Sequence, residues 1–181
     1  MMNRQKVLHI LRAIATISGE SKLVLVGSAT VLMRARNIPA EMLNTNEIDV
    51  FAPESKDEEM FADLIEGSIG RGSHFDRTFN YFGDGVSSKT ATMPHDWKDR
   101  AVVIGEHGIA NTEVIVPDLN DIALAKLVAW REKDRVWLEA GVRALILKPS
   151  SMRERLDRMP EVIPRAELER RVTQLEARLI D

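Results

Sequence analysis

The segment from residue 23 to residue 51 constrains the fold of this chain more than any other segment. A short apolar run at residues 23–26 (LVLV) ends in Gly27 and Ser28, a pattern typical of a buried strand followed by a tight turn. Residues 29–36 favour a helix. Residues 47–51 (EIDVF) then alternate acidic and apolar side chains, which indicates a second strand with one face in water.

The remaining hydrophobic patterning predicts further helices and short strands around this unit. Apolar residues at helical spacing predict helices over residues 4–18, 56–65, 122–130 and 136–147, the second of them capped by Ser55. Candidate strands lie at residues 78–82, 86–90, 101–104 and 113–116, and a Gly-Asp-Gly turn joins the first two. Together these elements predict an α/β fold, a small mixed β-sheet with flanking helices.

The C-terminal part reads as a helical addition to this fold. We expect a main domain over residues 1–147 and a C-terminal helical extension over residues 148–181, with helices broken at Pro160 and Pro164. An apolar stripe follows one face of the last helix and consists of Leu168, Val172, Leu175 and Leu179. The stripe predicts either packing on the chain's own core or a homodimer contact in which two stripes meet.

Composition excludes several classes of protein and site. The chain has 181 residues, 44% of them hydrophobic, and a formal net charge of -3, whereas proteins that mainly grip nucleic-acid phosphate are usually basic. It contains no cysteine, which excludes disulfides, a thiolate zinc site and a cysteine nucleophile, and fits a cytoplasmic protein. No apolar run approaches the roughly 20 residues that span a bilayer, so we expect no membrane partner.

Two acidic residues of the second strand suggest a metal site. Glu47 and Asp49 are two residues apart, so on a strand their side chains point the same way, and the two carboxylates repel each other. A divalent cation offsets that repulsion, and Mg²⁺ commonly takes one or two protein carboxylates together with substrate phosphates. The turn at Gly27 and Ser28 offers backbone N–H groups and a hydroxyl to phosphate oxygens.

The order of these motifs resembles the opening of the nucleotidyltransferase superfamily with the polymerase-beta-like fold. The resemblance implies that Gly27 and Ser28 bind a nucleoside triphosphate and that Glu47 and Asp49 hold Mg²⁺ or Mn²⁺. It also implies a further catalytic acid on a later strand. Asp84 lies near the expected place, and Glu113 is a second candidate. Glutamate at position 47 departs from the superfamily, where aspartate is commoner.

Three later segments resemble a narrower group, small prokaryotic nucleotidyltransferase-like proteins related to the toxin components of abortive-infection toxin–antitoxin systems. They are residues 94–100 (PHDWKDR), 121–127 (DIALAKL) and 130–135 (WREKDR). The resemblance implies that Lys126 is a cation that reaches the triphosphate; the alternative is an ordinary lysine on a helix surface. Lys133 and Asp134 are expected to form an ion pair between two helices.

Two functions of different classes follow from these observations. The first is metal-dependent transfer of a nucleoside monophosphate from a nucleoside triphosphate to an unknown acceptor, which is RNA, a protein or a small molecule. The alternative is a catalytically weak binding or regulatory module on the same fold, such as one half of a toxin–antitoxin pair. A third carboxylate beside Glu47 and Asp49 would favour the enzyme.

Overall fold

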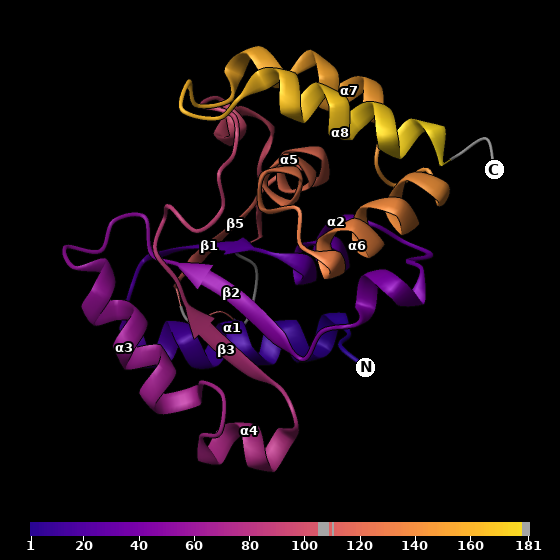
Figure 1. Cartoon of the computed structure of the whole chain (residues 1–181). Coiled ribbons are helices and arrows are strands. Elements are labelled where there is room, and N and C mark those ends of the chain that lie inside the picture. The colour runs from indigo at the N-terminus through magenta and orange to yellow at the C-terminus, as the bar shows by residue number, and fades with distance from the viewer. Residues whose placement is uncertain (105–108, 110, 179–181) are drawn as a thin grey trace.

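The chain forms a five-stranded mixed sheet with helices on both faces, as seen in a computed structural model that describes residues 1–104, 109 and 111–178 (Figure 1). This confirms the predicted α/β fold class. The helices are α1 (Arg4–Ser18), α2 (Val31–Arg34), α3 (Glu58–Ile69), α4 (His74–Phe79), α5 (Leu119–Ala129), α6 (Glu132–Arg143), α7 (Pro149–Glu154) and α8 (Arg165–Ala177). The strands are β1 (Lys22–Val26), β2 (Glu47–Phe51), β3 (Phe82–Gly85), β4 (Val102–Ile104) and β5 (Glu113–Val116).

The sheet places the two strands of the opening unit side by side. Its order is β3-β2-β1-β5-β4. β1 runs antiparallel to β2 and parallel to β5, while β3 runs parallel to β2. Val26 at the end of β1 is paired with Asp49 of β2, and Asp49 is paired with Asp84 of β3. Paired residues on neighbouring strands point to the same face, so the end of β1 and these two acids share one face of the sheet.

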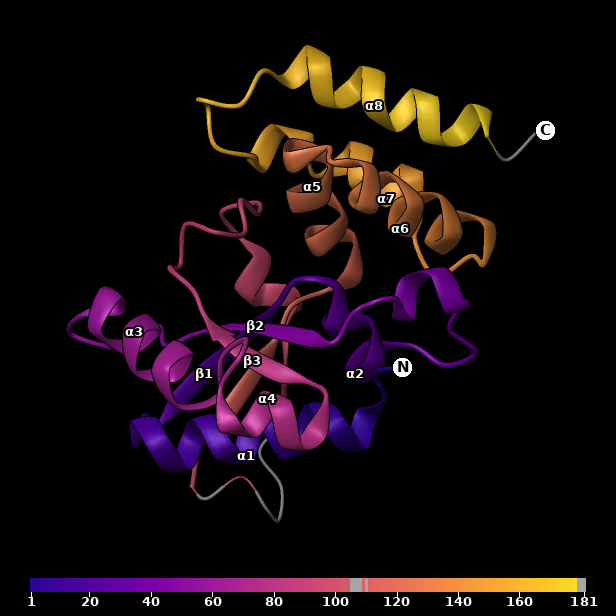
Figure 2. The ribbon, with the colours of Figure 1, turned by 60° about the horizontal axis from the view of Figure 1, so that its bottom comes forward.

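Helices α1 and α3 cover the opposite face, and α5 to α8 form a layer on the side of the acids (Figures 1 and 2). Two glycines of β3 let α1 and α3 approach closely. A Cβ on Gly83 would lie 2.7 Å from Ile10 Cγ2, and a Cβ on Gly85 would lie 2.7 Å from Ala62 Cα. The Gly-Asp-Gly segment is therefore a strand lying under two helices, and the prediction that it forms a turn is wrong.

The predicted strands at residues 78–82 and 86–90 are also wrong for the most part. Residues up to Phe79 belong to α4, because the Ser73 side chain accepts a hydrogen bond from the Asp76 backbone and caps the helix, and Asn80 closes it in a left-handed conformation. Strand β3 begins only at Phe82. Residues 86–90 form no strand, and the Ser87 hydroxyl and the Ser88 backbone donate hydrogen bonds to the carboxylate of Glu58 instead.

Several helix boundaries differ from those expected. The cap of α3 is Asp57 and not Ser55, because the Asp57 carboxylate accepts bonds from the N–H groups of residues 59 and 60. Helix α5 ends at a left-handed Trp130 with φ 50°, and α6 already begins at Glu132. The strands expected at residues 101–104 and 113–116 are confirmed within one residue.

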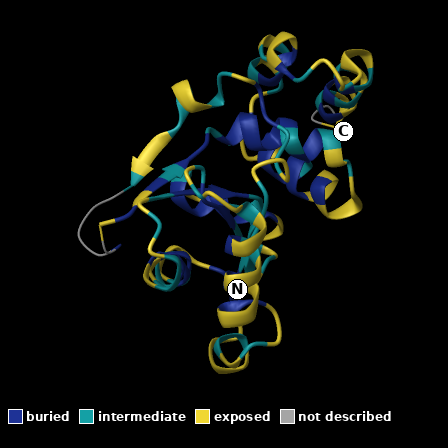
Figure 3. Cartoon of the chain, turned by 90° about the vertical axis from the view of Figure 1, so that its left-hand side faces the viewer, coloured by how far each residue is buried: buried dark blue, intermediate teal, exposed yellow. Residues whose placement is uncertain are grey.

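The apolar stripe of α8 packs inside the chain. Leu168, Val172 and Leu175 are buried in the hydrophobic core, at most 2% exposed; Leu179 lies outside the described residues. Helix α8 packs against α5, α6 and α7. In Figure 3 the buried positions run through the middle of the molecule and the exposed ones lie on its outer surface. The three described residues of the stripe thus cover the chain's own core.

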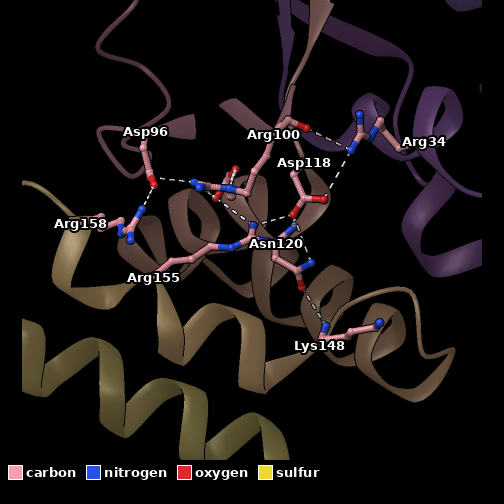
Figure 4. Close-up of polar contacts among 9 residues, drawn as sticks. Arg34, Asp96, Arg100, Asp118, Asn120, Lys148, Arg155 and Arg158 are labelled. Atoms are coloured by element: carbon pink, nitrogen blue, oxygen red, sulfur yellow. Dashed lines mark hydrogen bonds and ion pairs between the residues drawn. The ribbon is translucent and has the colours of Figure 1, made fainter. Parts of the chain in front are cut away.

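A network of arginines and aspartates ties the C-terminal helices to the rest of the chain (Figure 4). Asp121, which is fully buried, accepts hydrogen bonds from Arg100 and from Arg155. Asp118, the N-cap of α5, accepts from Arg155 and from Arg34 on α2. Further members are Asp96, which binds Arg100 and Arg158, and Asn120, whose side chain accepts from the Lys148 backbone.

None of the helices in the described part of the chain combines the length and the apolar character that crossing a bilayer requires.

Candidate active site

Three carboxylates lie together on the face of the sheet that turns toward α5. Glu47 and Asp49 are two residues apart on β2, and Asp84 is the in-register neighbour of Asp49 on β3, roughly 5 Å away from it between backbones. Asp84, rather than Glu113, is therefore the acid beside the pair. Glu113 is paired with Lys22 at the start of β1, whereas Asp49 is paired with Val26 at the end of that strand.

The turn after β1 touches the second of these acids. Gly27 has φ 72°, and a Cβ on it would lie 2.0 Å from Asp49 Oδ2. Both the backbone conformation and the close approach require glycine at this position. The carboxylate of Asp49 consequently lies against the turn that the sequence singles out for phosphate binding.

Lys126 reaches the same turn from the last turn of α5. Its Nζ donates to Ser28 Oγ at 2.9 Å and to Asp134 Oδ1 at 3.0 Å, and it lies 5.0 Å from the centre of the Trp137 ring. The residue is 7% exposed, so it is not a helix-surface lysine. Burial lowers the pKa of the ammonium, against the opposing charge of Asp134. Gly27, Ser28, Asp49 and Lys126 are thus brought together.

Asp134 is a buried residue of this arrangement that the sequence analysis did not place there. It is completely buried on α6 and binds Lys126 and Arg131, with Arg131 Nε at 2.8 Å. Burial favours the neutral acid, but the hydrogen bond from Arg131 and the charge of Lys126 keep its pKa below the usual value. The expected ion pair between Lys133 and Asp134 is wrong. The sequence feature that could have indicated the pair of Lys126 and Asp134 is their spacing of eight residues, with the helix break at Trp130 between them.

Two cations approach the first acid of the strand. Arg71, in the loop between α3 and α4, places Nη2 3.0 Å from Glu47 Oε2. Lys133, at the start of α6, places Nζ 3.8 Å from Glu47 Oε1. No periodicity or motif pointed to Arg71, because its contact depends on how the loop folds over β3. Glu47 is therefore paired in this structure, whereas no hydrogen bond or ion pair reaches the carboxylate of Asp49 from any described residue.

The electrostatics of the site are those of crowded carboxylates. Burial, followed by the charges of Glu47 and Asp84, raises the pKa of Asp49 to about 6, although Lys126 and Lys133 act in the opposite direction. Burial and the charge of Glu47 also raise the pKa of Asp84. The neighbouring carboxylates thus disfavour ionisation of Asp49 and Asp84, and a bound cation would relieve that repulsion.

A cleft opens beside these residues. Its volume is about 410 Å³, within the range that accommodates small-molecule ligands. Its walls include Ser28, Asn44, Thr45, Asn46, Glu47, Arg71, Lys133 and Trp137. The cleft brings Glu47 and Ser28 into one space, whereas Asp49, Asp84 and Lys126 are not among the residues that line it. The expectation that both acids of β2 face the same cleft as Ser28 is therefore met by Glu47 alone.

The donor set suits a hard divalent cation. No group of three or more His, Asp or Glu side chains among the described residues is arranged as a ready-made metal site. Mg²⁺ does not need one, since one or two carboxylates and the oxygens of a substrate phosphate complete its shell. Glu47 and Asp49 provide two such carboxylates, and Asp49 has no hydrogen-bond or ion-pair partner in the described chain. The residues therefore fit a divalent cation.

Comparison with known proteins identifies the family. No curated protein matches the chain, and no solved structure matches it. A family model described as "Nucleotidyltransferase of unknown function (DUF6036)" matches residues 5–178. The matched region contains the turn after β1, the acidic strand β2, its neighbour β3 and the helices that bear Lys126 and Asp134. The chain therefore belongs to this family of nucleotidyltransferases of unknown function.

Proposed function

We propose that the protein transfers a nucleoside monophosphate from a nucleoside triphosphate to the hydroxyl group of an acceptor, with release of pyrophosphate. Glu47 and Asp49 would hold Mg²⁺ or Mn²⁺, and Asp84 would complete the acidic site. The observation that carries the proposal is the position of Asp49. Its carboxylate lies against the Gly27 turn, in register with Asp84, and has no polar partner among the described residues.

Ser28 and Lys126 would bind the phosphates. The Ser28 oxygen accepts a hydrogen bond from Lys126, so its own proton is free to be donated to a phosphate oxygen. Lys126 uses two of its three N–H groups on Ser28 and Asp134 and keeps one for an anion. A positively charged group held in a largely water-free place stabilises the charge that builds up on the triphosphate.

Asp84 would act on the acceptor. Burial and the neighbouring charge of Glu47 raise its pKa above that of an ordinary aspartate. A more basic carboxylate is better suited to take the proton from an attacking hydroxyl. The cation, when bound, would supply neutralisation of the triphosphate charge. The proposal leaves the acceptor as RNA, a protein or a small molecule. It also includes a cytoplasmic location for the protein.

Pyrophosphate release tests this function. The protein is incubated with Mg²⁺ or Mn²⁺, each of the four nucleoside triphosphates, and RNA, a protein mixture or small hydroxyl compounds as acceptors. Asp49→Asn and Asp84→Asn should abolish the release. Glu113→Gln is the matched control, because it removes a strand carboxylate that lies away from the cluster, and it should leave the rate unchanged. Equal rates in Asp49→Asn and the unaltered protein would disprove the assignment.

A second candidate is a nucleotidyltransferase-fold binding or regulatory module with little catalysis, such as one half of a toxin–antitoxin pair. The observation in its favour is that Glu47 is already paired with Arg71 and Lys133, which compete with a cation for the carboxylate. Nucleotide binding without pyrophosphate release, under all acceptor conditions, would support this candidate over the enzyme.

A further inference from the structure

Arg71 lies over Phe82 of β3, beside the acidic strand β2. Its guanidinium carbon is 4.8 Å from the centre of the Phe82 ring, and Phe82 is the in-register neighbour of Glu47. The same guanidinium donates to Glu47 Oε2 at 3.0 Å. Nevertheless, its side chain is 73% exposed. One face of the guanidinium thus rests on the sheet, and much of the group remains open to the cleft.

The backbone around Arg71 is held in place. A Cβ on Gly70 would lie 2.4 Å from the Glu66 carbonyl oxygen, and Gly72 has φ 76°. The Gly72 N–H donates to Asp76 Oδ2 at 2.9 Å, and Arg77 donates to the Gly72 carbonyl oxygen. These contacts hold the backbone at Arg71 in place. A change of partner by the guanidinium would therefore require rotation of the side chain and not movement of the loop.

A cation on Glu47 would favour such a change. The guanidinium donates to Glu47 Oε2, so a divalent ion bound to the same carboxylate would stand close to a positive charge, and the two would repel each other. An anion brought in with the cation offers the guanidinium a new partner. Its planar set of N–H donors matches phosphate oxygens in pairs. Arg71 and Ser28 line the same cleft, so a polyphosphate at Ser28 is within this space.

We propose that Arg71 is a phosphate-binding residue that exchanges its ion pair with Glu47 for the triphosphate of the nucleotide when a divalent cation binds to Glu47. The inference rests on the proposed function, and it adds a role for the loop between α3 and α4. It predicts that loss of the Arg71 guanidinium strengthens binding of the cation alone and weakens binding of the cation together with phosphate. Arg71 competes with the cation when no phosphate is present, and it assists binding when phosphate is present.

Two probes that do not depend on the base separate these effects: Mn²⁺ alone, and inorganic tripolyphosphate with Mg²⁺. Calorimetry measures the dissociation constant of each. Arg71→Met keeps the aliphatic stem over Phe82 but removes the guanidinium. It should bind Mn²⁺ about two- to fivefold more tightly, since an exposed ion pair no longer competes. It should bind Mg²⁺-tripolyphosphate at least about tenfold more weakly, since a charge-assisted hydrogen bond is lost.

Two further variants control for charge and for geometry. Arg143→Met removes an exposed arginine of α6 that does not line the cleft, and both constants should stay as in the unaltered protein. Arg71→Lys keeps the charge without the planar donors and should restore tripolyphosphate binding only in part. Thermal melts of every variant show whether it is folded.

The outcomes distinguish this inference from the proposed function. If the unaltered protein binds neither Mn²⁺ nor Mg²⁺-tripolyphosphate, the metal-dependent function fails and the inference fails with it. If it binds both and Arg71→Met changes neither constant, only the inference is overturned. Weaker binding of both probes by a folded Arg71→Met would also overturn it, because Arg71 would then merely hold Glu47 in position.

Discussion

The carboxylate of Asp49 lies against Gly27 so closely that a β-carbon at position 27 would stand 2.0 Å from Oδ2. This contact joins the turn after β1 to the acidic strand β2. The two parts of the candidate site are therefore positioned by each other, and a change in one should be measurable in the other.

Gly27→Ala tests that contact. Alanine would meet both an unfavourable backbone conformation at φ 72°, ψ −163°, which is almost exclusive to glycine and costs about 1–3 kcal/mol, and the Asp49 carboxylate. We expect a lower thermal midpoint and loss of the rise that Mg²⁺ and a nucleoside triphosphate produce. Gly19→Ala is a control for a positive φ without a steric contact, because Gly19 lies in the left-handed region at φ 66°, ψ 10° and a Cβ on it would meet nothing within 4 Å. It should lower the midpoint less and keep the nucleotide effect; equal results for both variants would contradict the importance of the contact.

The pH dependence of stability should report on Asp49. Its pKa is about 6 in the folded protein against 3.8 for an ordinary aspartate. The folded state therefore binds more protons than the unfolded state between these values, and stability falls as pH rises through this window. Asp49→Asn removes the effect. In urea unfolding without ligand, the variant should be more stable than the unaltered protein by about 1–3 kcal/mol at pH 7.5 and about equal to it at pH 4. A variant that is less stable at pH 7.5 would show that the folded protein does not disfavour ionisation of this carboxylate.

The same variant should lose ligand-induced stabilisation. A ligand that binds only the folded state raises the thermal midpoint by mass action. Mg²⁺ with a nucleoside triphosphate should raise the midpoint of the unaltered protein and of Glu113→Gln but not that of Asp49→Asn. An undiminished rise in Asp49→Asn would show that this carboxylate is not a ligand.

Lys126 and Asp134 should behave as a coupled pair. Asp134→Ala leaves the buried ammonium without its carboxylate and should reduce stability by about 3–5 kcal/mol. The double variant Lys126→Met with Asp134→Leu removes both charges and should recover much of that loss, as measured by urea unfolding. It should still fail to bind Mg²⁺-tripolyphosphate, because the ammonium is absent. Recovery of both properties would exclude Lys126 from the phosphate site.

Val172→Asp tests the apolar stripe of α8. Val172 is completely buried within the chain, so an unpaired carboxylate there should reduce stability by several kcal/mol without changing the elution volume on gel filtration. Gln174→Asp adds the same charge at an exposed position of the helix and should change stability little. A folded Val172→Asp that elutes as a smaller species than the unaltered protein would point instead to a contact between copies.

Sequence patterns predict those parts of the fold whose local and tertiary preferences agree. The alternation around Glu47 and Asp49 and the apolar run before Gly27 each predict one strand, and both strands form. The region around Gly83 is wrongly predicted to form a turn, because its glycines are needed for the close approach of α1 and α3 to strand β3. No sequence pattern indicates the role of Arg71, because its contact with Glu47 exists only once the loop between α3 and α4 has folded. Asp134 could be paired with Lys126 only once the break between α5 and α6 was known.

The aspartates of α5 also bear on how the molecule comes apart. Asp121 is fully buried, and one of its two arginine partners, Arg155, belongs to the C-terminal helices. If those helices detached alone, a buried carboxylate would lose part of its compensation and the core would lose Leu168 and Val172. Partial opening at this boundary is therefore costly. The sheet and the C-terminal helices should melt together in one cooperative transition, with no populated state in which the sheet and the candidate cleft persist after these helices have detached.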